Sequence, residues 1–109
     1  GITEATADTI TDFVSGNDLL DLTAITNGNI GTYVETSGAG NNFATFTGNA
    51  TTSFTGSAVD IYVEYNLNGS GNTYILVDED SNGSVSAGDT LLILSGLSGS
   101  GAVDSSDFI

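Results

Sequence analysis

The sequence of 109 residues contains no lysine, arginine or histidine, and its 14 acidic side chains give a formal net charge of −14. Nucleic acids are bound through Lys and Arg side chains that neutralise phosphates, so this absence argues strongly against a nucleic-acid partner. Anionic membrane surfaces are disfavoured for the same reason. Self-repulsion of this size opposes a compact state, and divalent cations are the obvious means of reducing it.

Cysteine is also absent, so no disulfide can stabilise the chain, and metal ions, a sheet core or oligomerisation must do so. No apolar run approaches about 18 residues, and no charged segment followed by an apolar run opens the sequence. We therefore expect neither membrane insertion nor a Sec signal, and Gly1 suggests a fragment or a processed product. The length fits a single domain spanning residues 1–109.

Catalytic side chains are scarce. Without His, Cys, Lys or Arg there is no base for a serine nucleophile, no usual Zn²⁺ ligand set and no phosphate clamp. Pairs of carboxylates can hydrolyse glycosidic bonds, and Asp60 with Glu64 or Asp12 with Asp18 are the available pairs. Acidic residues at alternate strand positions are, however, expected of any soluble sheet. The prediction is a protein that is not an enzyme.

Residues 78–89 form an acidic loop that matches an EF-hand calcium loop place by place. Such loops take oxygen ligands from positions 1, 3, 5, 7, 9 and 12 and turn at a glycine at position 6. Gly83 is that glycine, and Val85 is the apolar residue expected to anchor the loop to a core. The predicted ligands are Asp78, Asp80, Asn82, Ser84 through its carbonyl, Ser86 directly or through a water, and Asp89.

The last predicted ligand is Asp89 rather than the usual Glu, and its shorter side chain reaches an ion less easily through both oxygens. We therefore expect weak binding, of the order of the 10⁻⁴–10⁻³ M dissociation constants of extracellular modules. A solvated acidic turn is the alternative, because Asp, Asn, Ser and Gly also dominate ordinary turns. The complete ligand spacing favours the calcium site, and Ca²⁺ is the predicted cofactor.

Apolar residues in the second half recur at a period of two, as in half-buried strands. Residues 58–78 predict a β-hairpin that turns at 68–72, with alternate residues on opposite faces. Residues 90–95 predict a strand buried on both faces. Residues 58–97 thus predict a hairpin, the acidic loop and a further strand, with the loop between two strands.

Residues 31–36 and 42–47 predict two more short strands, joined by a glycine-rich loop. No helical periodicity longer than two turns is apparent. The predicted fold class is therefore all-β: a single small β-sandwich or β-roll-like domain of antiparallel strands with calcium-binding loops.

Residues 1–25 form an acidic segment in which carboxylates alternate with apolar residues around Gly16. The apolar residues are expected to face a core while the carboxylates converge across the turn. This arrangement predicts a second cation site that uses some of Asp12, Asp18 and Asp21.

Residues 8–22 resemble a segment of RTX exoproteins, Asp-x-Ile-x-Asp-Phe-x-x-Gly-x-Asp-x-Leu-Asp-Leu, which closes a stack of calcium-binding nonapeptide repeats. Residues 74–80, 90–97 and 104–109 resemble later pieces of the same C-terminal region. The nonapeptide repeats themselves are missing, so no regular β-roll can be built from this sequence alone. The resemblance implies the capping region after the repeats of a type I secreted protein, such as a surface-layer protein, on or outside a bacterial cell. The tail, residues 98–109, then resembles an export signal, whereas a tail that merely tucks into the core is the alternative.

Two functions follow from these observations. The first is a calcium-driven module that folds after export and caps the rest of a larger exported chain. The second is a structural subunit that assembles with copies of itself in a surface layer or filament.

Overall fold

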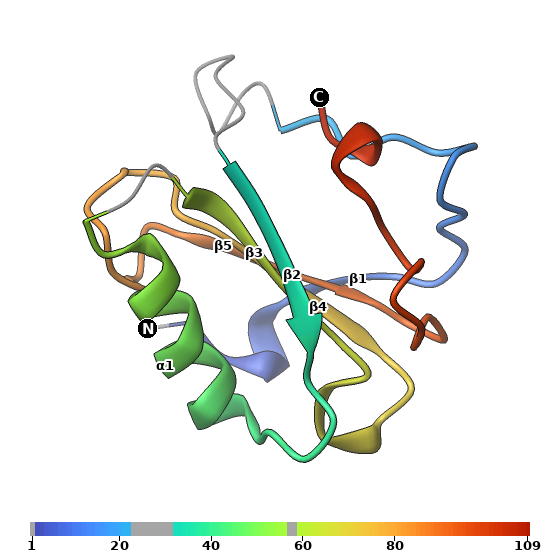
Figure 1. Cartoon of the computed structure of the whole chain (residues 1–109), viewed down its shortest axis with the longest axis horizontal. Coiled ribbons are helices and arrows are strands. Elements are labelled where there is room, and N and C mark those ends of the chain that lie inside the picture. Colours follow the sequence, from blue (N-terminus) through green and yellow to red (C-terminus); the bar gives the residue numbers. More distant parts are fainter. Residues whose placement is uncertain (1, 23–31, 57–58) are drawn as a thin grey trace.

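A five-stranded mixed β-sheet forms the centre of the structure, a computed structural model that describes residues 2–22, 32–56 and 59–109 (Figure 1). The strands lie in the order β1-β5-β4-β3-β2. Strand β4 is antiparallel to β3 and β5, whereas the outer pairs β1–β5 and β2–β3 are parallel. The strands are β1 (Asp8–Ile10), β2 (Thr32–Ser37), β3 (Val59–Tyr65), β4 (Thr73–Val77) and β5 (Thr90–Leu94).

The hairpin predicted over residues 58–78 is confirmed, because β3 and β4 pair antiparallel with Ile61 opposite Val77 and Glu64 opposite Tyr74. Between them the chain turns through the 3₁₀-helix η2 (Leu67–Gly69). The expectation of antiparallel strands alone is wrong, since two of the four strand pairs are parallel. Some predicted residues lie outside the described residues: Gly31 and Ala58 at the ends of predicted strands, and residues 23–25 of the N-terminal acidic segment.

The strand predicted over residues 42–47 is wrong, because these residues begin helix α1 (Phe43–Phe54). Its sequence is rich in Thr and includes a Gly, which are weak helix formers, so local propensity does not reveal it. Asn42 caps its first turn by accepting a hydrogen bond from the Thr45 N–H at 2.8 Å. The buried residues Phe46, Ala50 and Phe54 recur every four positions on one side, which is the spacing of a helix face that packs on a core. The fold is therefore mostly strands but not purely all-β.

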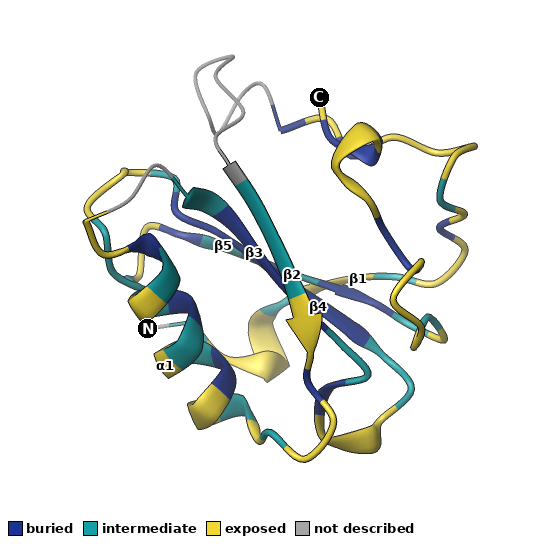
Figure 2. Ribbon diagram, viewed as in Figure 1, coloured by how far each residue is buried: buried dark blue, intermediate teal, exposed yellow. Residues whose placement is uncertain are grey.

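Helix α1 connects the parallel strands β2 and β3 and covers one face of the sheet (Figure 1). Its inward face is buried and its outward face exposed (Figure 2). The core beneath it contains three packed aromatic rings, with Phe46 at 5.9 Å from Tyr62 and 5.7 Å from Tyr74 between ring centroids. Leu76, Leu91 and Ile93 complete this core from β4 and β5.

Among the described residues, the opposite face of the sheet is covered by the two terminal segments rather than by a second sheet. Phe13, Leu20 and Leu22 from the N-terminal segment and Val103 and Phe108 from the C-terminal segment pack on it. The sheet side chains of this second core are Ile61, Val63, Ile75, Val77 and Leu94. Because β5 supplies Leu91 and Ile93 to one core and Leu94 to the other, the prediction that residues 90–95 are buried on both faces is confirmed.

The terminal segments are joined by hydrogen bonds around Asp107, which lies in the 3₁₀-helix η3 (Ser105–Asp107) and is 1% exposed. Its carboxylate accepts hydrogen bonds from the Ser15 hydroxyl at 2.6 Å and from the Gly16 N–H at 2.9 Å. Gly16 has a φ of +82°, a conformation that suits glycine. Backbone bonds between Leu20 and the residues Asp107 and Ile109 extend the junction. The N-terminal segment therefore holds the C-terminal residues against the core.

A second buried carboxylate, Glu64 of β3, fixes helix α1 to the sheet. It is 0% exposed and accepts hydrogen bonds from Asn41 at 2.8 Å, Asn49 at 3.2 Å and the Tyr62 hydroxyl at 2.9 Å. Asn49 lies on α1, so the carboxylate joins helix and sheet. Glu64 is thus occupied by structural hydrogen bonds, which argues against its use as a solvent-facing catalytic acid. Over the described ranges, no helix has the length and apolar character to cross a membrane.

Candidate metal centre

The acidic loop, residues 78–89, connects the antiparallel strands β4 and β5. Val77 and Thr90 are paired across these strands, so Asp78 directly after β4 and Asp89 directly before β5 are brought to the same edge of the sheet. The predicted position of the loop between two strands is therefore confirmed. The strand pairing, rather than the loop alone, brings its two ends together.

Three carboxylates of the loop meet, those of Asp78, Asp80 and Asp89, each with one oxygen within 4.8 Å of the others. Calcium binds oxygens at about 2.3–2.6 Å, so ligands on opposite sides of the ion lie about 5 Å apart. The three oxygens therefore have the spacing of ligands around one ion. Asp78 is 3% exposed and Asp89 is 9% exposed, whereas Asp80 faces solvent.

The two carboxylate oxygens of Asp78 differ in their hydrogen bonding. Its Oδ2 accepts a hydrogen bond from the Gly83 N–H at 3.0 Å. Its Oδ1 is buried and has no hydrogen-bond partner among the described residues. Buried polar atoms are almost always paired, so this oxygen has an acceptor site that a water or a cation would fill. Glu35 Oε1 is also buried without a described partner, but Glu35 belongs to no described group of carboxylates close enough to share an ion.

The Asp89 carboxylate accepts hydrogen bonds from the backbone at the beginning and in the second half of the loop. Its two oxygens accept the N–H groups of Glu79 at 3.1 Å and of Ser86 at 2.7 Å. Each carboxylate oxygen has a second lone pair, so these bonds leave Asp89 able to contact an ion. The neighbouring Glu79 carboxylate accepts a hydrogen bond from the Thr90 hydroxyl and is not part of the three-carboxylate group.

Asn82 and Ser86 lie beside Asp80, as the predicted spacing requires. The Asn82 side-chain nitrogen donates to Asp80 Oδ2 at 2.8 Å, and the Ser86 hydroxyl lies 3.5 Å from the same oxygen. Asn82 Oδ1 accepts hydrogen bonds from the N–H and the hydroxyl of Ser84 at 2.8 and 3.0 Å. The neutral amide thus turns its N–H donor toward Asp80, and a flip of the amide would direct its oxygen there instead.

The electrostatics of the loop are those of carboxylates crowded without a positive charge. Burial raises the pKa of Asp78, opposed by the hydrogen bond from Gly83, and the nearby Asp80 raises it further. Burial likewise raises the pKa of Asp89, opposed by the bond from the Ser86 N–H and reinforced by the charge of Asp78. A raised pKa means that the ionised form is disfavoured here, and a cation is the ligand that would reverse this preference.

The N-terminal aspartates are arranged differently from the loop. Asp18 accepts a hydrogen bond from the Val14 N–H at 2.8 Å and so caps the turn at Gly16. Asp12 and Asp21 are exposed. In the part of the chain that the structure describes, these three carboxylates are not within ligand distance of one another. The turn at Gly16 instead holds Asp107, which the sequence analysis did not foresee, and the second cation site stays a prediction.

Two threonines of helix α1 and its C-terminal cap contact the loop and were missed by the sequence analysis. The Thr55 hydroxyl donates to the Gly83 carbonyl at 2.9 Å, and Thr51 Oγ1 accepts the Val85 N–H at 3.4 Å. They lie 28 and 34 residues before the loop residues that they contact, and only the packing of α1 on the sheet brings them near the loop. No sequence signal could have identified them.

No protein-family model matches the sequence, and a search of curated proteins finds no significant match. The site is therefore interpreted from its own geometry. Its available donors are carboxylate, amide, hydroxyl and carbonyl oxygens, which suit hard cations such as Ca²⁺ or Mg²⁺ rather than softer transition metals.

Proposed function

We propose that this protein is a calcium-binding module that uses Ca²⁺ to stabilise its fold, with Asp78, Asp80 and Asp89 as the principal ligands. The observation that carries the proposal is Asp78 Oδ1, which is buried, lacks a described partner and belongs to the three-carboxylate group. An ordinary solvated turn would expose such an oxygen to water. Asn82, the Ser84 carbonyl and Ser86 complete the ligand set expected from the loop spacing.

The charge of the chain explains why binding and folding are coupled. Fourteen carboxylates with no Lys, Arg or His repel one another in any compact state. Because the ion joins residues at the ends of β4 and β5, its binding stabilises their pairing, and binding free energy becomes folding free energy. At a calcium concentration about one hundred times the dissociation constant, linkage adds about 2.7 kcal/mol of stability per site.

Thermal unfolding in excess Ca²⁺ and in excess chelator tests the proposal. We expect a higher unfolding midpoint with Ca²⁺ and a strongly destabilised or unfolded chain with chelator. A midpoint that is the same in both conditions would show that the acidic loop is an ordinary solvated turn. Mg²⁺ should substitute poorly, because it requires octahedral geometry at about 2.0–2.1 Å and releases its waters reluctantly.

Substitution of the ligands separates ion binding from a general reduction of charge. Asp80→Asn and Asp89→Asn should each raise the calcium concentration needed for folding while the circular dichroism spectrum of the folded state stays the same. Asp8→Asn is the matched control, because Asp8 is exposed on β1, outside the carboxylate group, and loses the same charge. An equal effect of all three substitutions would assign the calcium response to net charge instead.

We further propose that the module works on or outside a bacterial cell, as part of a larger exported protein. The support is the resemblance of residues 8–22 and 104–109 to the C-terminal region of RTX exoproteins, and the abundance of free calcium outside cells suits a weak site. Secretion of the chain by a type I exporter, compared with a chain that lacks residues 98–109, tests this part. Equal export of both chains would refute an export signal in the tail.

A structural subunit is the second candidate, and one observation favours it. Val14 and Leu19 on either side of the turn at Gly16 are 49% and 59% exposed, which is high for large apolar residues. Sedimentation with and without Ca²⁺ separates the two functions, because only a structural subunit forms large calcium-dependent assemblies. A monomer under both conditions would exclude the structural subunit and leave the folding module as the remaining function.

A further inference from the structure

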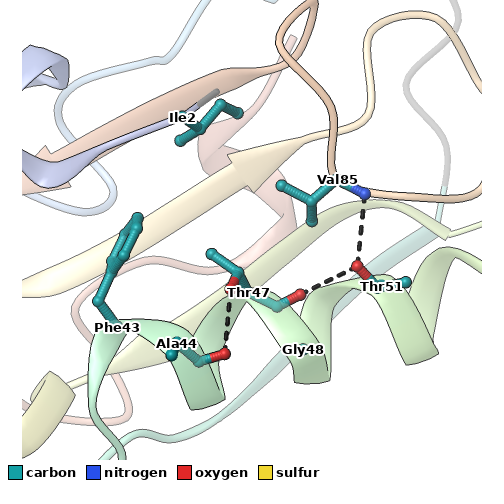
Figure 3. A pocket seen from close by; sticks show the side chains of 7 residues that line it. All are labelled: Ile2, Phe43, Ala44, Thr47, Gly48, Thr51 and Val85. Atoms are coloured by element: carbon teal, nitrogen blue, oxygen red, sulfur yellow. Dashed lines mark hydrogen bonds between the residues drawn. The ribbon is translucent and has the colours of Figure 1, made fainter.

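Helix α1 and the acidic loop are in direct contact, although the loop spacing alone would make the site self-contained. Val85 and Ile2 both pack against the core beneath α1. The Val85 N–H donates to Thr51 Oγ1 at 3.4 Å (Figure 3). One helical turn later, the Thr55 hydroxyl donates to the carbonyl of Gly83 at 2.9 Å. The C-terminal end of the helix therefore lies against the turn of the loop.

Gly83 links this helix end to the buried carboxylate. Its carbonyl accepts from Thr55, and its N–H donates to Asp78 Oδ2 at 3.0 Å. Its φ is +77°, and a Cβ built on it would lie 3.6 Å from both Phe54 O and Thr55 Cα, so the turn is close to the helix. Gly83 thus occupies one oxygen of Asp78 and leaves the other, Oδ1, for the ion.

We propose that Thr55 is a positioning residue of the calcium site: it holds Gly83 so that Asp78 Oδ1 faces the ion, and it thereby couples ion binding to the docking of α1. This inference rests on the proposed calcium site and deepens it. By linkage, a helix that favours calcium binding is itself held more firmly against the sheet when the ion is bound. The ion then stabilises the β2–α1–β3 part of the fold in addition to the β4–β5 loop that contains it.

A purely structural role for Thr55 is the competing explanation, because its hydroxyl also lies 2.7 Å from the Thr51 carbonyl of its own helix. Thr52 provides a matched control. Its hydroxyl makes the same kind of bond, to the Gly48 carbonyl at 3.1 Å, and it is likewise exposed. Thr55→Val and Thr52→Val therefore each remove one hydroxyl proton that bonds a helix carbonyl, but only the Thr55 proton is shared with a carbonyl of the loop.

Isothermal titration with Ca²⁺ on the full chain and on these two variants tests the inference. Thr55→Val should weaken calcium binding about fivefold, the effect of one lost hydrogen bond, whereas Thr52→Val should change it less than about twofold. Thr55→Ser, which restores the hydroxyl, should return the dissociation constant to within about twofold of the parent. In chelator, the unfolding midpoints of the two valine variants should be similar.

The outcomes distinguish the inference from the function on which it rests. Equal calcium affinity of Thr55→Val and Thr52→Val overturns the positioning role while the calcium site stands. Absence of heat and of any midpoint shift with Ca²⁺ in the parent chain overturns the calcium site itself. Near-ultraviolet circular dichroism of Tyr62 and Tyr74, which pack with Phe46 beneath α1, reports helix docking. A calcium-induced change that persists unaltered in Thr55→Val counts against the coupling.

Discussion

At the scale of single residues, Asp78 is a side chain whose ionised form is poorly supported by its neighbours. Burial and the nearby Asp80 raise its pKa, and only Oδ2 has a described hydrogen-bond donor. A group of this kind lowers the stability of the ion-free protein and strengthens the attraction for a cation. The Asp78 side chain therefore destabilises the ion-free protein but contributes to the stability of the calcium-bound protein.

Asp78→Asn should make these opposite effects visible. In chelator the variant should be more stable than the parent by about 1 kcal/mol, because a neutral amide replaces a desolvated charge. In calcium titrations its affinity should fall by about tenfold or more, because a neutral amide oxygen replaces a charged carboxylate ligand. Denaturant unfolding in chelator and calorimetry with Ca²⁺ measure the two quantities. Asp80→Asn is the control, since Asp80 is exposed and its replacement should give a smaller gain in chelator.

Asp107 is a buried carboxylate of the opposite kind. Burial acts to raise its pKa, but the hydrogen bonds from Ser15, Gly16 and the Asp104 N–H together outweigh it, and the pKa is lowered. A lowered folded-state pKa gives stability that is present above the unfolded-state pKa and is lost as the pH falls through the folded-state value. The unfolded-state pKa of Asp is about 3.9, so this loss begins near pH 4 and continues below it.

Asp107→Asn should lower stability at neutral pH and make the decline below about pH 4 shallower than in the parent. Urea unfolding in calcium-free buffer across that range measures both effects. Asp12→Asn is the charge-matched control, because Asp12 is an exposed carboxylate in the N-terminal segment that contacts Asp107. Parallel curves for the parent and Asp107→Asn would show that this carboxylate does not secure the C-terminal segment.

At the scale of elements, helix α1 depends on tertiary contacts more than on its own sequence. Gly48 lies within it, exposed, and a Cβ at that position would meet nothing within 4 Å. Gly56 follows the helix with a φ of +65°, the left-handed conformation that often ends helices. A Cβ is therefore compatible with the backbone at Gly48 but strained at Gly56, although both positions are exposed.

Gly48→Ala should stabilise the protein by about 0.5–1 kcal/mol, because alanine loses less backbone entropy in a helix. Gly56→Ala, the same chemical change eight residues later, should destabilise it by about 1–2 kcal/mol, because a Cβ disfavours the left-handed conformation. Denaturant unfolding in excess Ca²⁺ measures both differences. Destabilisation by Gly48→Ala would mean that the helix needs the space this glycine leaves.

At the scale of the whole molecule, uncompensated negative charge sets the conditions for stability. The structure measures 30 × 29 × 23 Å. At an ionic strength of about 0.01 M the Debye length is about 30 Å, so every carboxylate interacts with every other. At about 0.15 M it falls to about 8 Å, and only near neighbours still repel one another.

In chelator, the unfolding midpoint should therefore rise as NaCl is increased from about 0.01 M to about 0.15 M. The calcium-saturated protein should respond less, because the ion already neutralises the three clustered carboxylates of the loop. Thermal scans at fixed pH measure both responses. If NaCl leaves the ion-free midpoint unchanged, self-repulsion does not limit the stability of this chain.

Features that depend on a few neighbouring residues could be predicted from the amino-acid sequence. The spacing of Asp78, Asp80 and Asp89 around Gly83 identified the loop, and its carboxylates do meet. The alternation in residues 58–78 identified the hairpin, because a period of two is imposed by strand geometry. The absence of Lys and Arg argues against a nucleic-acid partner, because that inference needs only the composition.

Features that depend on distant contacts emerge only in the folded chain. Helix α1 exists because burial of Phe46, Ala50 and Phe54 outweighs the weak helix propensity of its Thr and Gly residues. The turn at Gly16 holds Asp107 because the core brings the two terminal segments together, at a sequence separation no local pattern spans. The contact of Thr55 with Gly83 has the same origin. Local spacing therefore places ligands along the chain, whereas the environment of each ligand is set by which parts of the chain the core packs against it.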